Sequence, residues 1–225
     1  MLQNLNFQEH GVEIKSELVS NDLIQSIISE ISVADQVIQK YGVRNAEKRF
    51  SSISNLINSD VIIDEAKRIL GKKVQVVRVI FFDKTPEKNW LVTWHQDKTV
   101  ALNQKFDLDG WGRWTLKDGT HHVQPPVEVL DQMITFRLHL DPANDENGCL
   151  KVIPSSHENG ILKQKQIDKI VSEKDHVSCV VNAGDAVIMR PHILHASSKA
   201  IVLDHRRIVH VEFSSFELPV GICWA

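Results

Sequence analysis

Apolar residues recur at helical spacing near the start of the chain. Residues 21–38 carry a run of isoleucines that fall on one face of a helix: Ile24, Ile27, Ile28 and Ile31. Positions three and four apart are neighbours on a helix surface, so this spacing predicts an amphipathic helix. Ser20 or Asn21 is a suitable N-cap for it, because both side chains accept a hydrogen bond from the first turn.

A second helix is predicted over residues 59–70. Asp60 lies near its positive start, Lys67 and Arg68 lie near its negative end, and Gly71 follows as a stop. We therefore expect residues 1–73 to be mostly supporting helices that cover a sheet.

The period changes at residue 74, where β-branched and aromatic residues become frequent. Short strands are predicted at residues 74–82, 134–140, 149–153, 177–181, 186–189 and 208–213. The turn signal at residues 145–148 precedes one of them, and residues 161–174 read as an inserted helix or loop. Many short strands joined by turns predict a mainly β fold with flanking helices. We expect a double-stranded β-helix, a cupin-like jelly roll, with its core at residues 74–215.

One predicted strand leaves the direction of its polar face open. Residues 134–140 alternate, with Thr135, Arg137 and His139 opposite an apolar face. If the polar face lines the interior, Arg137 meets a substrate or cosubstrate; if it faces water, it is only solvated, which is the commoner case.

Residues 104–127 show little regular period but contain several large side chains. We expect this segment to be a lid insertion with Trp111, Trp114 and His122 among its substrate contacts. The alternative is a surface excursion whose aromatic residues are fixed against the barrel.

Composition narrows the class of protein. With 225 residues, 42% of them hydrophobic, the chain can bury a sizeable core as one domain, residues 1–225. A formal net charge of −3 gives no basic footprint for nucleic acid, and no signal-like or membrane-spanning run is present. Three cysteines without metal-type spacing predict reduced thiols in a cytoplasmic protein.

Three separated side chains suggest a metal site. His95 and Asp97 are two residues apart, so on an extended strand both point the same way, and His195 would arrive from a distant strand. Two imidazoles and one carboxylate suit a divalent iron that keeps open positions. Arg206, eleven residues after His195, is placed to hold the far carboxylate of a dicarboxylic cosubstrate.

These fragments together resemble the phytanoyl-CoA hydroxylase (phytanoyl-CoA dioxygenase) family of iron(II)- and 2-oxoglutarate-dependent oxygenases. The resemblance covers about residues 74–215 and rests on His95-Gln96-Asp97, on the middle segment 147–157, and on His195 followed by Ser197 and Arg206. It implies that His95, Asp97 and His195 bind iron(II) and are the catalytic centre. It also implies that Arg206 and Ser197 bind 2-oxoglutarate, and that dioxygen is the second cosubstrate.

The resemblance decides between neighbours that the residues alone leave open. Its spacing selects His195 over His192 as the ligand, and Arg206 over Arg207, since adjacent residues on a strand face opposite ways. The implied activity is a dioxygenase, with hydroxylation of a small-molecule metabolite and release of succinate and carbon dioxide. The same ligands also serve desaturation. Two alternatives are a cupin-like metalloenzyme without 2-oxoglutarate and a noncatalytic binding or sensing module. The sequence does not indicate the substrate or the oligomeric state.

Overall fold

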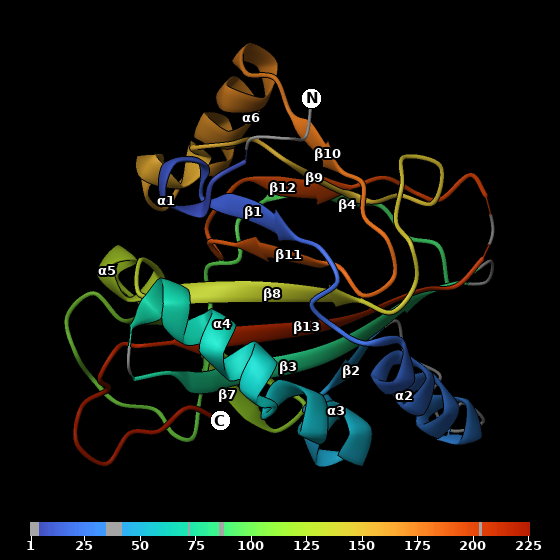
Figure 1. The fold of residues 1–225 in the computed structure, drawn as a ribbon. Helices are drawn as coiled ribbons and strands as arrows, with labels where there is room; N and C mark the ends of the chain where they lie inside the picture. Colours follow the sequence, from blue (N-terminus) through green and yellow to red (C-terminus); the bar gives the residue numbers. More distant parts are fainter. Residues whose placement is uncertain (1–4, 35–41, 72, 86–87, 203) are drawn as a thin grey trace.

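Two antiparallel sheets form the centre of the computed structural model, which describes residues 5–34, 42–71, 73–85, 88–202 and 204–225 (Figure 1). The larger sheet has the strand order β1-β11-β8-β13-β3-β2. Its strands are β1 (Val12–Lys15), β2 (Gly42–Arg44), β3 (Gln75–Lys84), β8 (Met133–His139), β11 (Ala186–Met189) and β13 (Arg206–Ser214). The smaller sheet, in the order β10-β9-β12-β4, consists of β4 (Val92–His95), β9 (Leu150–Val152), β10 (Val177–Cys179) and β12 (His195–Ser197).

A third sheet of three strands and a set of helices complete the fold. The third sheet has the order β5-β7-β6 and consists of β5 (Val100–Leu102), β6 (Gly112–Lys117) and β7 (Thr120–Gln124). The α-helices are α1 (Phe7–His10), α2 (Asn21–Ala34), α3 (Ser51–Ile57), α4 (Asp60–Leu70), α5 (Val127–Leu130) and α6 (Gln164–Glu173). Two 3-10 helices, Ala46–Lys48 and Ser156–Asn159, lie in connections. This mainly β architecture with flanking helices confirms the fold class expected from the sequence.

The larger sheet has one apolar face and one polar face. On β8, Ile134, Phe136 and Leu138 are fully buried in the cluster that also contains Ile27 of α2 and Ile62 of α4. The helices therefore cover this face, as Figure 1 shows for α3 and α4. Burying these side chains is the main favourable contribution to folding at this interface, at about 25 cal/mol per Å² of apolar surface.

The polar face of β8 points into the molecule. Thr135 and His139 are fully buried, and Arg137 lines a cavity together with His95 of the smaller sheet. Of the two directions that the sequence leaves open for this face, the structure has the interior one. The two central sheets thus face each other across a cavity.

Both predicted N-terminal helices are present, but the segment is less helical than expected. Helix α2 ends at Ala34, and residues 35–38 of the prediction lie outside the described part of the chain. The prediction of a mostly helical segment missed β1, which pairs with β11, and β2, which pairs with β3. These strands have only four and three residues, too few to show a period that sequence patterning detects.

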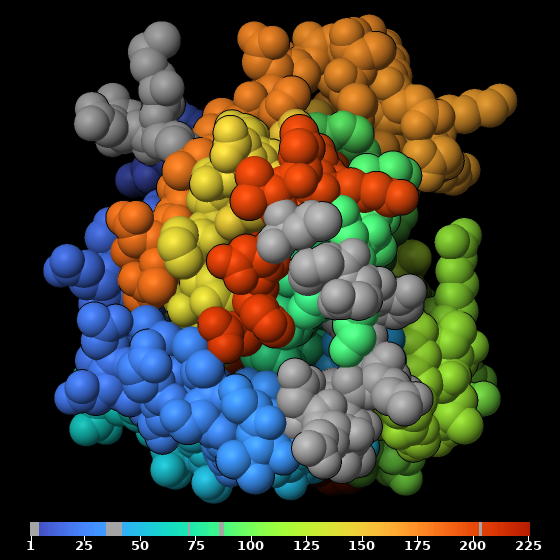
Figure 2. All heavy atoms as spheres, turned by 90° about the vertical axis from the view of Figure 1, so that its right-hand side faces the viewer, coloured from blue at the N-terminus to red at the C-terminus, as the bar shows by residue number. Residues whose placement is uncertain are grey.

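Connections from distant parts of the sequence meet on one side of the molecule. Figure 2 shows the β8–β9 connection (yellow) and the β12–β13 connection (orange-red) side by side above the blue N-terminal helices. The backbone N–H groups of Ile201 and Val202 donate to the Glu146 carbonyl, 2.6 and 3.2 Å away. Asn89, before β4, exchanges two hydrogen bonds of 2.8 Å with the Ala200 backbone. These hydrogen bonds join the β12–β13 connection to the β8–β9 connection and to the β3–β4 connection, which contains Asn89.

All three cysteines are free thiols; Cys149 and Cys179 are buried and Cys223 is exposed. In the described ranges, no helix combines the length and the apolar character that crossing a membrane requires.

Candidate functional site

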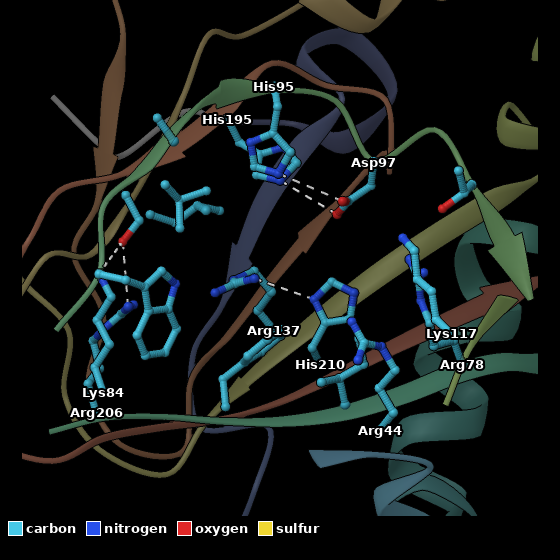
Figure 3. A pocket seen from close by; sticks show the side chains of 18 residues that line it. Arg44, Arg78, Lys84, His95, Asp97, Lys117, Arg137, His195, Arg206 and His210 are labelled. Carbon is cyan, nitrogen blue, oxygen red and sulfur yellow. Dashed lines mark hydrogen bonds and ion pairs between the residues drawn. The ribbon is translucent and has the colours of Figure 1, made fainter. Parts of the chain in front are cut away.

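The structure brings His95, Asp97 and His195 together at one end of the cavity (Figure 3). The distance from His95 Nε2 to Asp97 Oδ1 is 3.8 Å, and that from His195 Nε2 to Asp97 Oδ2 is 3.5 Å. Donor atoms this close share one small volume, as the ligands of a single ion do. The three side chains offer two imidazole nitrogens and a carboxylate on one side of that volume.

Strand pairing sets the two histidines opposite each other. β4 and β12 are antiparallel neighbours, and His95 is the direct partner of His195. Their ring centroids are 4.2 Å apart. Direct cross-strand pairs have the shortest side-chain separation in a sheet, so residues a hundred positions apart in the sequence come close enough to share one ion.

Gln96, directly after β4, fixes the His95-Gln96-Asp97 segment from the side opposite the cavity. Its side-chain amide donates to the Gly160 carbonyl (2.8 Å) and the His192 carbonyl (2.7 Å), and its oxygen accepts from Leu162 N–H (2.8 Å). Gln96 is buried, and the backbone N–H of Asp97 donates to the Pro191 carbonyl at 2.9 Å. Because successive side chains alternate, fixing Gln96 in the core orients His95 and Asp97 toward the cavity.

Backbone carbonyls select the free nitrogen of each histidine. His95 Nδ1 lies 2.8 Å from the Thr93 carbonyl, and His195 Nδ1 lies 2.9 Å from the Ile193 carbonyl. A carbonyl only accepts, so each Nδ1 carries the proton and each Nε2 has its lone pair free for a cation. A metal-binding histidine usually donates its other N–H to such a partner.

The local electrostatics also suit a metal. Burial lowers the pKa of His195 to about 4, which keeps the imidazole neutral near pH 7. Burial by itself raises the pKa of Asp97. The electrostatic influence of four neighbouring side chains outweighs burial and holds this pKa below its usual range: His195, His210, His95 and Arg78. The site therefore presents a neutral imidazole beside an ionised carboxylate, the protonation states that metal binding requires.

The other end of the cavity, which has a volume of about 250 Å³, carries buried cations. Lys84 at the end of β3 is the direct cross-strand partner of Arg206 at the start of β13. Both side chains are nearly fully buried and both line the cavity. Like charges directly opposite each other destabilise a sheet, so an anion between or beside this pair would stabilise it.

The hydrogen bonds of this pair leave room for an anion. Lys84 Nζ donates to the Ser197 hydroxyl (3.0 Å) and to the Ser198 carbonyl (2.7 Å), while Ser197 Oγ donates to the Gly148 carbonyl (2.7 Å). Arg206 Nε and Nη1 are buried and have no hydrogen-bond partner among the described residues. Burial, helped by the neighbouring cations, lowers the pKa of Arg206 to about 10 and that of Lys84 to about 7. A carboxylate fits these donors.

A contrasting pair of opposite charge lies farther along the same two strands. Arg78 and Glu212 are cross-strand partners and form an ion pair, and Glu212 Oε1 lies 3.2 Å from His210 Nε2. Arg137 lies between the two ends, with Nη1 at 3.4 Å from His210 Nδ1. Figure 3 shows Arg137 and His210 beneath the three candidate ligands. Asp97, His210 and Glu212 also lie within 4.8 Å of one another, so His210 connects the two groups.

In each of the two pairs of alternatives, His192 or His195 and Arg206 or Arg207, the structure places only one side chain in the cavity lining. Arg207 lies outside the cavity lining, and its guanidinium forms two hydrogen bonds with Asp141, of 2.8 and 2.7 Å. His192 is buried away from the three candidate ligands, and its Nε2 lies 3.2 Å from Asp131 Oδ1. His195 and Arg206 are therefore the members of each pair that reach the cavity.

Residues 104–127, where the sequence showed little period, contain the β6–β7 hairpin, whose register shifts between Gly112 and Thr115. Trp111 and Trp114 pack against Phe106, with ring centroids 4.9 and 5.5 Å away. These two and His122 are outside the set of residues that line the cavity, whereas Lys117 of the same hairpin lines it. This packing matches the alternative of aromatic residues fixed against the barrel, and the substrate lid stays a prediction.

Sequence reasoning missed several residues that line the cavity. They are Arg44, Arg78, Lys84, Lys117 and His210. The signal for two of them was the alternation of β3, because Arg78, Ile80, Phe82 and Lys84 are spaced by two and all line the cavity. Arg44 and Lys117 come from short strands, and only the tertiary structure brings them to the site.

The facing sheets, the histidine–carboxylate group and the buried cations are typical of jelly-roll proteins whose interior can hold a metal and an anion. A model of the family described as "Phytanoyl-CoA dioxygenase (PhyH)" matches residues 29–208. The chain belongs to the phytanoyl-CoA dioxygenase family, whose members are iron(II)- and 2-oxoglutarate-dependent oxygenases.

Individual relatives agree with this assignment. The chain is 33% identical to Phytanoyl-CoA dioxygenase 1 of Oryza sativa subsp. japonica over 86 residues, which cover 33% of this chain and 31% of that protein. The matched segments span about a third of the length of the curated relatives.

Two crystal structures share the fold. AviO1 from Streptomyces viridochromogenes Tue57 superimposes with a TM-score of 0.71 at 18% identity, covering 95% of this chain and 93% of AviO1. HygX from Streptomyces hygroscopicus with nickel and 2-oxoglutarate bound has a TM-score of 0.67 at 14% identity, covering 92% and 84%. At these identities the likeness shows the fold alone.

Proposed function

We propose that the protein is an iron(II)- and 2-oxoglutarate-dependent dioxygenase that hydroxylates a small metabolite and releases succinate and carbon dioxide. The observation that carries this proposal is the cross-strand pair Lys84–Arg206, two buried cations without an ion pair in the described part of the chain. It lies in the same cavity as the His95, Asp97 and His195 group. A metal site next to an anion site suits a keto acid that binds both.

The donor set fits iron(II). His95 Nε2, the Asp97 carboxylate and His195 Nε2 would hold the ion, because both Nδ1 atoms already face carbonyls. When bound, the metal and the keto acid would activate dioxygen, which is the oxidant for attack on a C–H bond. The protein residues hold the ligands in place and exclude water. Of the three candidate ligands, His195 is the most buried, with 3% of its surface exposed.

The basic end fits the far carboxylate of 2-oxoglutarate. Arg206 Nε and Nη1 have no hydrogen-bond partner among the described residues and Nη2 has only a long contact of 3.5 Å with Ser197 Oγ, so the guanidinium has donors left for a carboxylate, and Lys84 adds a charge from the neighbouring strand. Ser197 accepts from Lys84 and donates to Gly148, so it holds the amine toward the cavity. With both ends fixed, the keto acid takes one orientation relative to the metal ligands.

Anaerobic titration of the metal-free protein with iron(II) and 2-oxoglutarate tests the proposal. We expect the weak visible charge-transfer absorption of a chelated keto acid, and 2-oxoglutarate-dependent formation of succinate once oxygen is admitted. Iron binding without this absorption would contradict the proposal and favour a cupin-like metalloenzyme that does not use 2-oxoglutarate. Absorption without succinate under any condition would favour a noncatalytic binding module.

The affinity for 2-oxoglutarate should depend on pH through Lys84. Burial lowers the pKa of this amine to about 7, so it is charged below that pH and loses the charge above it. Between about pH 7 and pH 8.5, we expect the dissociation constant of 2-oxoglutarate to rise by up to about tenfold per pH unit. The charge-transfer titration at each pH measures it. Lys84→Met should bind 2-oxoglutarate more weakly at low pH and lack this slope; the same slope in that variant would assign it to another group.

A further inference from the structure

The cavity carries more positive charge than the proposed cofactors balance. Six basic side chains line it: Arg44, Arg78, Lys84, Lys117, Arg137 and Arg206. Their neighbouring carboxylates are Asp97 in the lining, Glu212 on Arg78 and Asp118 on Arg44. A divalent metal and a dianionic keto acid cancel each other, so a surplus of about three positive charges remains when both are bound.

Part of this surplus lies at the opening of the cavity. Arg44 of β2 and Lys117 of β6 line the cavity and are also exposed, so they mark its mouth. In Figure 3 they lie on one side of the His95, Asp97 and His195 group, and Lys84 and Arg206 lie on the other. The mouth is therefore a second basic region, separate from the one assigned to 2-oxoglutarate.

The two cations at the mouth have two common neighbours, Asp118 and His122. Arg44 Nη1 lies 2.8 Å from Asp118 Oδ2, which joins β2 to the residue after Lys117. Burial and then the charges of Arg78, Lys117 and Arg44 lower the pKa of His122 to about 4. Lys117 has no ion pair with any residue in the described ranges. An incoming molecule thus meets Lys117, which has no counterion among the described residues, and Arg44, which is paired with the Asp118 carboxylate.

We propose that the substrate is a small molecule with an oxyanion group, a carboxylate or a phosphonate, which Arg44 and Lys117 hold at the mouth of the cavity. This inference rests on the proposed function, because it assigns the basic end at Lys84 and Arg206 to the cosubstrate. The volume of about 250 Å³ must hold both molecules, and it is below the 300–1,000 Å³ of usual ligand sites. The part of the substrate that enters is accordingly short.

Small anions can test this with the complex already loaded with iron(II) and 2-oxoglutarate under anaerobic conditions. Methylphosphonate and acetate are the anionic probes, and acetamide is the neutral one. Binding is measured by calorimetry and by the change in the charge-transfer absorption. We expect at least one anion to bind without displacing 2-oxoglutarate, acetamide to bind far more weakly, and added salt to weaken anion binding.

A second experiment removes the two positive charges at the mouth and compares the affinity for the anion with that of the wild type. In the double variant Arg44→Gln, Lys117→Gln, the affinity for the anion should fall by about tenfold or more, which corresponds to about 1.4 kcal/mol. Arg113→Gln is the matched control, since it removes an exposed cation from the same strand outside the cavity lining. The affinity of the Arg113→Gln variant for the anion should stay at the wild-type value.

The outcomes separate this inference from the proposed function. If the charge-transfer absorption fails to form in the wild type, the proposed function is wrong, and the inference fails with it. If the absorption forms normally, three results overturn the inference alone. They are no binding of either anion, displacement of 2-oxoglutarate by the anion, and equal weakening in the double variant and in Arg113→Gln.

Discussion

Replacing Asp97 with alanine is expected to abolish stoichiometric iron(II) binding and, with it, all succinate formation. The carboxylate lies within 3.8 Å of both free imidazole nitrogens and contributes the negative charge of the donor set. We expect more than about 100-fold weaker iron binding, because outer partners of metal ligands alone are typically worth 10–100-fold. Anaerobic titration with iron(II), followed by metal analysis after gel filtration, measures the loss.

A matched control separates the loss of a ligand from a change in overall charge. Asp109→Ala removes an exposed carboxylate outside the cavity lining and should leave iron binding unchanged. Circular dichroism of each variant checks the fold. A folded Asp97→Ala protein that binds one iron as tightly as the wild type would remove Asp97 from the metal site.

The second large effect is expected at Arg206. Arg206→Ala should raise the dissociation constant of 2-oxoglutarate by about 30-fold or more, since removing one partner of a buried charge pair costs about 2–5 kcal/mol. The anaerobic charge-transfer titration measures this constant, and iron binding itself should persist. Arg206→Lys should recover part of the affinity, because it restores the charge without the planar pair of donors.

Arg207→Ala provides the control for Arg206→Ala. Arg207 carries the same charge on the same strand but points away and forms hydrogen bonds with Asp141. Arg207→Ala should lower stability, visible in thermal unfolding, and leave the affinity for 2-oxoglutarate within about twofold of wild type. Equal losses of affinity in the two variants would mean that the effect is general charge and not a specific contact.

Long amphipathic patterns were sufficient to predict much of the fold. Isoleucines at helical spacing predicted α2, and the charged ends of residues 59–70 predicted α4, which begins at Asp60. Strand β8 followed from its clean alternation. These elements are each buried on one face, so their sequences record the period directly. Strands β1 and β2 were missed because they pair with strands far away in the sequence. The β6–β7 hairpin was missed because most side chains of β6 are exposed, so that strand has no buried face to give a period.

The candidate site was predictable where chemistry and spacing coincide. His95, Asp97 and His195 stand out because two imidazoles and a carboxylate form a recognisable ligand set. The sequence did not indicate that the polar face of β8 is interior, since only the second sheet decides what that face meets. For the same reason Lys84 was not recognised as the partner of Arg206 until the pairing of β3 with β13 was known.

The pairing of β3 with β13 also limits how this site can vary. Arg78 and Lys84 are six residues apart on the same face of β3, a separation of about 20 Å along the strand. The register with β13 is continuous over this interval, and its irregularity falls just beyond, between Glu212 and Phe213. Inserting a single residue between Arg78 and Lys84 would turn one of these side chains away from the cavity, to the apolar face of the sheet that the helices cover. Adaptation to longer or shorter substrates is therefore expected in the segments that carry Arg44 and Lys117, and β3 should keep its length.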